Sequence, residues 1–181
     1  MKGDGNPQIL IYTGDGKGKT SAAMGQMLRA LGHGGKCAVL QFLKSDPKTL
    51  DSGEWAAAQT LGVTWKNYGC GFSWKGDNNE KNRALAIQGW EQAKRWISVG
   101  CYDMLILDEF TYAFSLGYLD AEQISLWISD HKGKKSFPHM VITGRNCPKE
   151  LISIADIVSE IQEIKHPFSQ NKRKPLPMIE F

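Results

Sequence analysis

The sequence predicts an α/β fold in which a mostly parallel sheet carries helices on both faces. Three observations support this: short apolar, β-branched runs, amphipathic helical patterns between them, and no repeated or linker-like segment. Near-continuous apolar strands are typical of parallel sheets that are covered on both faces. Strands that alternate with helices indicate βαβ units with right-handed crossovers. We therefore expect residues 1–181 to form a single domain.

The predicted strands are the apolar runs. A run over Ile157–Ile164 alternates apolar and polar residues, so we expect it at an edge of the sheet. The other strands are expected to be buried, because they contain almost no polar side chains. These buried strands are Ile9–Thr13, Cys37–Leu43, Met104–Leu107 and Met140–Thr143.

Two longer helices are predicted from the spacing of apolar residues. Lys19–Leu31 places its apolar residues on one face and is followed by a glycine-rich segment, which is typical of a helix end. Asn78–Val99 repeats apolar residues at the spacing of one helix face. Both helices would lie between strands and pack against the sheet.

Two further helices are predicted from their capping signals. Asp120, with Gln123 three residues later, resembles a capping box ahead of an apolar helical pattern. Near the carboxyl end, Asn146 or Cys147 is expected to cap a last helix that has Pro148 in its first turn.

Composition and charge limit the classes of function. The chain has 22 Lys and Arg against 19 Asp and Glu, a net charge of +3 that is too mild to indicate a nucleic-acid-binding protein. We expect no membrane span, because no apolar stretch approaches about 18 residues. The amino terminus lacks the apolar region of a signal peptide, and the 4 cysteines form no CxxC pair. Free thiols suit a reducing compartment, so a cytoplasmic location is expected.

The segment between the first strand and the first helix has the pattern of a phosphate-binding loop. It reads TGDGKGKT over residues 13–20, and its glycines allow backbone N–H groups to point toward an anion at a helix amino terminus. Lys19 is expected to contact phosphate oxygens, and the Thr20 hydroxyl to bind Mg²⁺. The usual pattern is GxxxxGK[ST], but Thr13 stands where its first glycine belongs and Gly14 follows. This departure indicates a different arrangement of the phosphates.

A pair of acidic residues follows one of the buried strands. Asp108 and Glu109 end the run YDMLILDEF, at the carboxyl edge where ligands bind in open α/β sheets. In P-loop proteins a carboxylate at such a position serves Mg²⁺. The loop and the acidic pair together predict a Mg²⁺-nucleotide site. They leave open an ATPase or nucleotide switch, a small-molecule kinase and a group transferase.

The segment NYGCGFSWKGD contains two aromatic residues among glycines. Phe72 and Trp74 are two positions apart, so they face the same way on an extended chain. Aromatic side chains on a glycine-rich loop indicate either a local packing cluster or a cover over something apolar.

These motifs together resemble the P-loop ATP:corrinoid adenosyltransferases. The resemblance covers nearly the whole chain in the family's order, and the shifted loop glycine belongs to the family's pattern. It implies a P-loop NTPase-like (RecA-like) fold. The matching segments are TGDGKGKT at 13–20, VLQFLK at 39–44, GFSW at 71–74, DMLILDEFTY at 103–112, VITGR at 141–145 and VSEI…KHPF within 158–168.

The resemblance implies an unusual use of ATP. The family transfers the 5′-deoxyadenosyl group to the cobalt of a reduced corrinoid, cob(I)alamin or a precursor, and releases triphosphate. ATP is bound in a reversed orientation, with Thr20 and Glu109 as ligands of the Mg²⁺ (or Mn²⁺) and Asp108 at the same metal site as a nearby acceptor. The implied ATP-binding residues are Gly14, Asp15, Gly16, Lys17, Gly18, Lys19, Thr20, Ser21 and Arg145.

The resemblance also implies catalytic roles for Phe72 and Trp74, beside the charge neutralisation by Lys19. In the family the two aromatics shield the lower face of the corrin ring and displace its axial ligand, so that a flavoprotein-type reductant can deliver the electron that forms Co(I). A homodimer is expected from the resemblance. Because only about a dozen residues precede the loop, a partner subunit is a candidate for covering the site.

Overall fold

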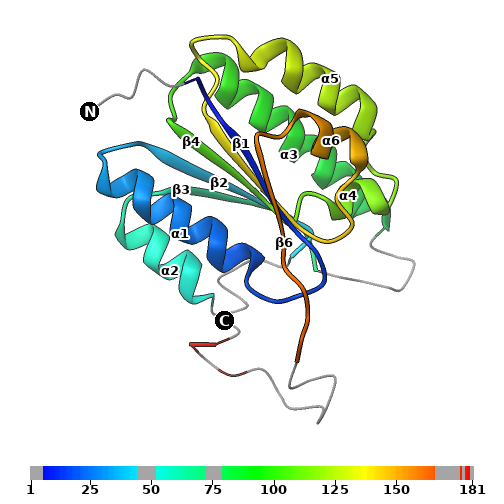
Figure 1. Cartoon of the computed structure of the whole chain (residues 1–181), viewed down its shortest axis with the longest axis horizontal. Helices are drawn as coiled ribbons and strands as arrows, with labels where there is room; N and C mark the ends of the chain where they lie inside the picture. The colour runs from blue at the N-terminus through cyan, green and yellow to red at the C-terminus, as the bar shows by residue number, and fades with distance from the viewer. Residues whose placement is uncertain (1–5, 45–51, 72–78, 166–175, 177, 180–181) are drawn as a thin grey trace.

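The computed structural model describes residues 6–44, 52–71, 79–165, 176 and 178–179. These residues form a six-stranded sheet with the strand order β3-β2-β4-β5-β1-β6 (Figure 1). Every neighbouring pair of strands is parallel, which confirms the predicted α/β class and its P-loop NTPase-like architecture. The strands are β1 (Ile9–Thr13), β2 (Cys37–Phe42), β3 (Thr64–Tyr68), β4 (Met104–Asp108), β5 (His139–Thr143) and β6 (Ile157–Glu160).

Helices cover both faces of the sheet. In Figure 1, α1 and α2 lie on one side of it, and α3, α4, α5 and α6 lie on the other. Successive side chains of each strand point to opposite faces of the sheet, and helices cover both faces. The residues on both faces of an inner strand must therefore be apolar. The helices are α1 (Lys19–Gly32), α2 (Gly53–Thr60), α3 (Asn79–Val99), α4 (Tyr112–Ser115), α5 (Ala121–Lys132) and α6 (Lys149–Ile154).

Strand β4 shows how this alternation divides the core. Leu105 and Leu107 belong to the core beneath α3 and α5, whereas Met104 and Ile106 belong to the core beneath α1. Asp108 follows Ile106 by two positions and therefore lies on the α1 face. The apolar strand thus delivers one carboxylate to the carboxyl edge of the sheet, on the side where α1 begins.

Most predicted elements are confirmed, with differences at their ends. The strand expected over Cys37–Leu43 ends one residue earlier, because Leu43 has a φ of 62°, which no strand residue adopts. The edge strand β6 ends at Glu160, and the chain beyond it turns to lie against the loop after β1. The capping box is confirmed: the Asp120 side chain accepts a hydrogen bond from the backbone N–H of Gln123 at 2.9 Å.

The prediction for the last helix was wrong by one residue. Pro148 is its N-cap, with extended backbone, rather than a residue of its first turn. Cys147, one of the two expected caps, instead donates its backbone N–H to Thr13 Oγ1 at 3.3 Å. This tertiary contact ties the start of α6 to the end of β1.

Three elements were not predicted: β3, α2 and α4. Strand β3 lies at the edge of the sheet and is only half-buried. Its sequence, TWKNY, therefore does not need to be apolar throughout, and it lacks the apolar run by which the inner strands were predicted. Helix α2 is short, and its start depends on Ser52, whose side chain accepts from the backbone N–H of Trp55. In the described part of the chain, no helix is long and apolar enough to cross a membrane.

Candidate nucleotide and metal site

The loop between β1 and α1 packs against the chain that follows β6. Gly16 donates its backbone N–H to Ile161 O at 2.7 Å, and a Cβ on Gly16 would lie 2.5 Å from Gln162 O. Gly18, the N-cap of α1, has a φ of 108°, a conformation that costs other residues free energy. The glycine pattern is therefore set by a close backbone approach at position 16 and by a left-handed turn at position 18.

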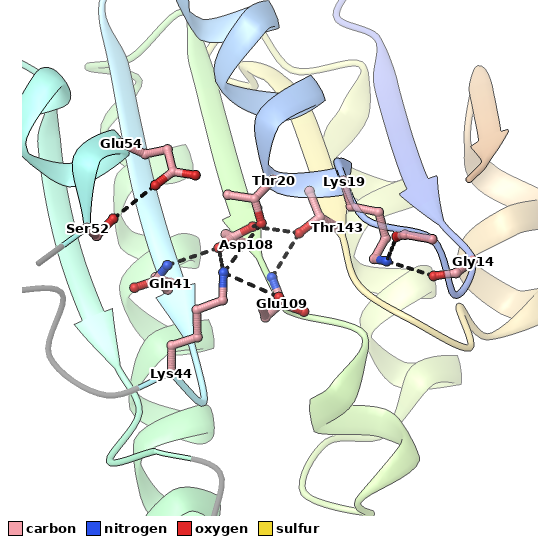
Figure 2. A network of polar contacts seen from close by, with 11 residues as sticks. Gly14, Lys19, Thr20, Gln41, Lys44, Ser52, Glu54, Asp108, Glu109 and Thr143 are labelled. Atoms are coloured by element: carbon pink, nitrogen blue, oxygen red, sulfur yellow. Dashed lines mark hydrogen bonds and ion pairs between the residues drawn. The ribbon is translucent and has the colours of Figure 1, made fainter. Parts of the chain in front are cut away.

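Lys19 is the first residue of α1 and its side chain folds back into this loop. The residue is only 8% exposed, and Nζ donates to Gly14 O at 2.8 Å and to Gly16 O at 2.6 Å (Figure 2). Burial lowers the pKa of the ammonium, and the carboxylate of Glu109 partly opposes this shift. The arrangement places the Lys19 charge at the amino terminus of α1. The helix dipole and the unpaired backbone N–H groups at this end also favour a bound anion.

Asp108 is fully buried and has a complete set of hydrogen-bond donors. Its Oδ1 accepts from Thr20 Oγ1 at 2.8 Å and from Thr143 Oγ1 at 2.7 Å, and its Oδ2 accepts from Gln41 Nε2 at 3.0 Å. Lys44 Nζ donates to the same Oδ2 at 3.2 Å (Figure 2). Burial acts to raise the pKa of Asp108, but the Lys44 charge and the hydrogen bonds outweigh it and lower the pKa. All four lone-pair positions of an ionised carboxylate are thereby occupied.

Glu109 differs from its neighbour because one of its oxygens is free. Its backbone has a φ of 57° and its N–H donates to Thr143 Oγ1 at 2.9 Å, so the residue leaves β4 in a sharp turn. Oε1 lies 3.3 Å from Lys44 Nζ, whereas Oε2 is buried and has no hydrogen-bond partner among the described residues. Burial and the adjacent Asp108 charge raise the pKa of Glu109. Glu109 therefore offers an oxygen that a bound cation would satisfy.

Lys44 is a site residue that the sequence reasoning missed. It lies just beyond β2, and both Asp108 and Glu109 accept from its ammonium at 3.2 and 3.3 Å. Burial acts to lower its pKa, but the two carboxylates outweigh burial and raise it. The available signal was the segment VLQFLK, in which Gln41 interrupts a buried apolar strand and a lysine follows that strand at the same sheet edge as the acidic pair.

Arg145 reaches the loop from the end of β5. Its Nη2 donates to Asp15 O at 3.1 Å, and its Nε lies 3.8 Å from Asp15 Oδ1. The Arg145 carbonyl accepts from Thr111 Oγ1 at 2.5 Å, which ties the end of β5 to the start of α4. A second cation thus lies beside the phosphate-binding loop, and it is half-exposed, in contrast to Lys19.

Comparison with known proteins assigns the chain to a family. The model of the family ATP:corrinoid adenosyltransferase BtuR/CobO/CobP matches residues 5–181. The chain belongs to this family. The recognition made from the sequence motifs is therefore confirmed.

Similar curated proteins agree with the family match. A corrinoid adenosyltransferase of Escherichia coli (strain K12) is 37% identical over 160 residues, which cover 88% of this chain and 79% of the relative. The corrinoid adenosyltransferase CobA of Salmonella typhimurium (strain LT2) is 36% identical over 160 residues, which also cover 88% of this chain and 79% of the relative. A corrinoid adenosyltransferase of Sinorhizobium sp is 35% identical over 174 residues, covering 92% of this chain and 77% of the relative.

The structure brings most residues of the predicted adenosyltransferase site together at one edge of the sheet. The loop over 14–20 lies beside Arg145, and Asp108 and Glu109 lie beside Thr20. Ser21 lies in the first turn of α1 and is exposed. Phe72 and Trp74 lie outside the described residues.

The described chain ends beside the site just before these two aromatics. Gly71 donates its backbone N–H to Leu43 O at 3.0 Å, next to Lys44. The buried Asn82 of α3 accepts from the Cys70 N–H at 3.2 Å and donates to Gly71 O at 3.3 Å. Gly71 therefore lies close to the carboxyl end of β2.

The donor set fits a hard divalent cation. Mg²⁺ prefers oxygen ligands and commonly uses one or two protein groups together with substrate phosphates and water. The Thr20 hydroxyl and the unpaired Glu109 Oε2 supply oxygens of this kind beside the phosphate-binding loop. Among the described residues, no cluster of three or more His, Cys, Asp or Glu could hold a metal by itself.

Proposed function

We propose that this chain transfers the 5′-deoxyadenosyl group of ATP to the cobalt of a reduced corrinoid and releases triphosphate. The observation that supports this most strongly is the family match over residues 5–181. The named relatives carry the same activity in their names, at 35–37% identity. The ATPase and kinase alternatives are not favoured, because neither family nor relative points to them.

The loop and its lysine would hold the leaving group. In the proposed reaction the Co(I) electron pair forms a bond to C5′ of the ribose, and the bond between C5′ and the triphosphate oxygen breaks with its electrons on that oxygen. Triphosphate leaves as a strong anion, so fixed positive charge near it stabilises the transition state. Lys19 and Arg145, which both contact the backbone of the loop, would supply this charge together with the amino terminus of α1.

The proposed metal ligands are Thr20 and Glu109. When bound, Mg²⁺ or Mn²⁺ would neutralise part of the triphosphate charge. Asp108 was expected at the metal, close to these two ligands; because its oxygens are engaged by protein donors, we propose that it orients the Thr20 hydroxyl rather than binding the metal directly. Such outer contacts fix the direction of a ligand's lone pairs.

The remaining predictions concern the corrinoid and the partners. We propose that Phe72 and Trp74 cover the lower face of the corrin ring, which is supported by the position of Gly71 beside the site. A flavoprotein-type reductant, a homodimer and a cytoplasmic location stay predictions, as does the absence of nucleic-acid and membrane partners.

The decisive experiment is an analysis of the phosphate products. Enzyme, Mg²⁺-ATP and chemically reduced cob(I)alamin are mixed, and the products are separated by ion chromatography while the formation of the cobalt–carbon bond is followed by absorbance. We expect triphosphate in equal amount to adenosylated corrinoid, and none without corrinoid. ADP as the product, with or without corrinoid, would overturn the proposal in favour of a hydrolase or kinase.

A further inference from the structure

We propose that the Lys44 ammonium and the divalent metal share one cation site, which the lysine holds until the nucleotide brings the metal. This inference rests on the proposed function, because the metal is the one expected to bind with ATP. Lys44 Nζ lies 3.2 Å from Asp108 Oδ2 and 3.3 Å from Glu109 Oε1. It also lies 3.4 Å from Thr20 Oγ1. The ammonium is therefore surrounded by the same side chains that are proposed to bind or orient the metal (Figure 2).

The acidic pair requires a cation in this position. Asp108 is fully buried and the Glu109 side chain is only 15% exposed, and two buried carboxylates without a counter-charge would be strongly destabilising. In the described part of the chain, Lys44 is the only cation that makes an ion pair with either residue. It therefore supplies the compensation that a metal would otherwise give.

Lysine and metal exclude one another at this distance. An ammonium at Thr20 Oγ1 and Glu109 Oε1 and a divalent cation at Thr20 Oγ1 and Glu109 Oε2 would lie a few ångströms apart, where the repulsion is strong in a partly buried environment. The oxygens of Asp108 are fully occupied while Lys44 is in place. Glu109 retains only Oε2 for another partner. A metal can therefore bind tightly only when the lysine has moved.

Lys44 has the freedom to move, in contrast to the residues around it. Its side chain is 24% exposed, whereas Asp108 and Thr143 are fully buried within strands. It follows Leu43, which has a φ of 62° and lies beyond the end of β2, so Lys44 is not fixed by the strand ladder. A triphosphate bound in the loop beside Thr20 would offer the displaced ammonium a new anionic partner.

The inference makes metal affinity depend on the presence of the nucleotide. The test uses Mn²⁺ alone as the probe, with the free ion measured by electron paramagnetic resonance during titration of the nucleotide-free protein. We expect weak binding by the wild type and binding at least about tenfold tighter by Lys44→Met, because a competing charge has been removed. Lys44→Arg keeps the charge and is expected to retain the weak binding of the wild type.

A matched control removes a charge elsewhere. Lys66 is exposed, lies on the neighbouring strand β3, and is paired with Leu40, whose side chain belongs to the opposite face of the sheet from the site. Lys66→Met should therefore leave the Mn²⁺ affinity unchanged. Lys44→Gln keeps a polar head group and should reproduce the effect of Lys44→Met, so it serves if the methionine variant folds poorly.

Two results would overturn the inference. One is equal or weaker Mn²⁺ binding in the folded, charge-free Lys44 variants. The other is tight binding that survives Glu109→Gln in the Lys44→Met background, because the metal would then lie elsewhere. Neither result bears on the proposed function, which is judged by the triphosphate product of the wild-type enzyme.

Discussion

Replacing Gly16 by alanine tests whether the chain after β6 fixes the phosphate-binding loop. A Cβ at this position would lie 2.5 Å from Gln162 O, 2.7 Å from Gln162 C and 2.8 Å from Ile161 O. All three atoms belong to the backbone and cannot swing away as a side chain would. To reach an ordinary contact the two segments must separate by about 0.9 Å, which would also stretch the 2.7 Å hydrogen bond from Gly16 N to Ile161 O beyond hydrogen-bonding range.

The expected cost follows from these two effects. A lost hydrogen bond costs about 1 kcal/mol and overpacking in a tight site about 1–3 kcal/mol, so Gly16→Ala should lower the free energy of unfolding by roughly 3 kcal/mol. For a chain of this size this corresponds to a fall in Tm of about 6–12 °C. Because the displaced loop also carries the Lys19 contacts, ATP affinity should fall as well.

The assay is thermal unfolding followed by circular dichroism, with ATP affinity measured by calorimetry. Gly25→Ala is the matched control: Gly25 lies within α1, is exposed, and a Cβ there would meet nothing within 4 Å. Removing glycine from an open helical position should raise stability by about 0.5–1 kcal/mol. If Gly16→Ala unfolds and binds ATP like the wild type, the loop is not held by the chain beyond β6 and the reasoning is refuted.

Three further changes probe the site. Asp108→Asn should cost roughly 2–4 kcal/mol in urea unfolding at neutral pH, because a buried carboxylate that pairs with Lys44 is lost. Since the pKa of Asp108 in the folded protein lies below the ordinary value of an aspartate, its stabilisation is fully present above that ordinary value and is lost as pH falls through the folded pKa. In a plot of the free energy of unfolding against pH, the variant should therefore lose less stability than the wild type at acidic pH. An equal loss in both proteins would contradict the lowered pKa of Asp108. Lys19→Ala should weaken ATP binding severely in calorimetry, whereas unchanged affinity would show that the loop does not hold the nucleotide. Phe72→Ala or Trp74→Ala should damage turnover from cob(II)alamin far more than turnover from pre-reduced cob(I)alamin, and equal losses would contradict the shielding role.

The inner strands and the loop could be predicted because their signals are local. Ile9–Thr13 is apolar throughout and is followed by glycines and Lys19, so strand, turn and helix are each specified within a few residues. Strand β3 gave no such signal, because it is stabilised by pairing with β2 rather than by its own composition. The start of α6 was misplaced for a similar reason: Cys147 bonds to Thr13, which is 134 residues away in the chain.

The partners within the site were the part that the sequence did not reveal. Asp108 was recognised from its position after an apolar strand, but its bonds to Gln41, Lys44 and Thr143 join residues from three strands. Their sequence separations range from 35 to 67 residues, so no short motif records them. These partners show which donors occupy the oxygens of Asp108, which no sequence motif records.

By itself the sequence determined the fold class, the glycine-rich turn between β1 and α1 and the family, because each depends on residue types at short, fixed spacing. Only the tertiary structure decided which oxygens of the acidic pair are occupied and that Lys44 lies between them. It also decided that the backbone of the residues after β6 lies too close to position 16 to leave room for a Cβ. The physical reason is that hydrogen bonds, burial and ion pairing in the site depend on where the parallel strands end relative to one another. These relative positions follow from the pairing register of the sheet.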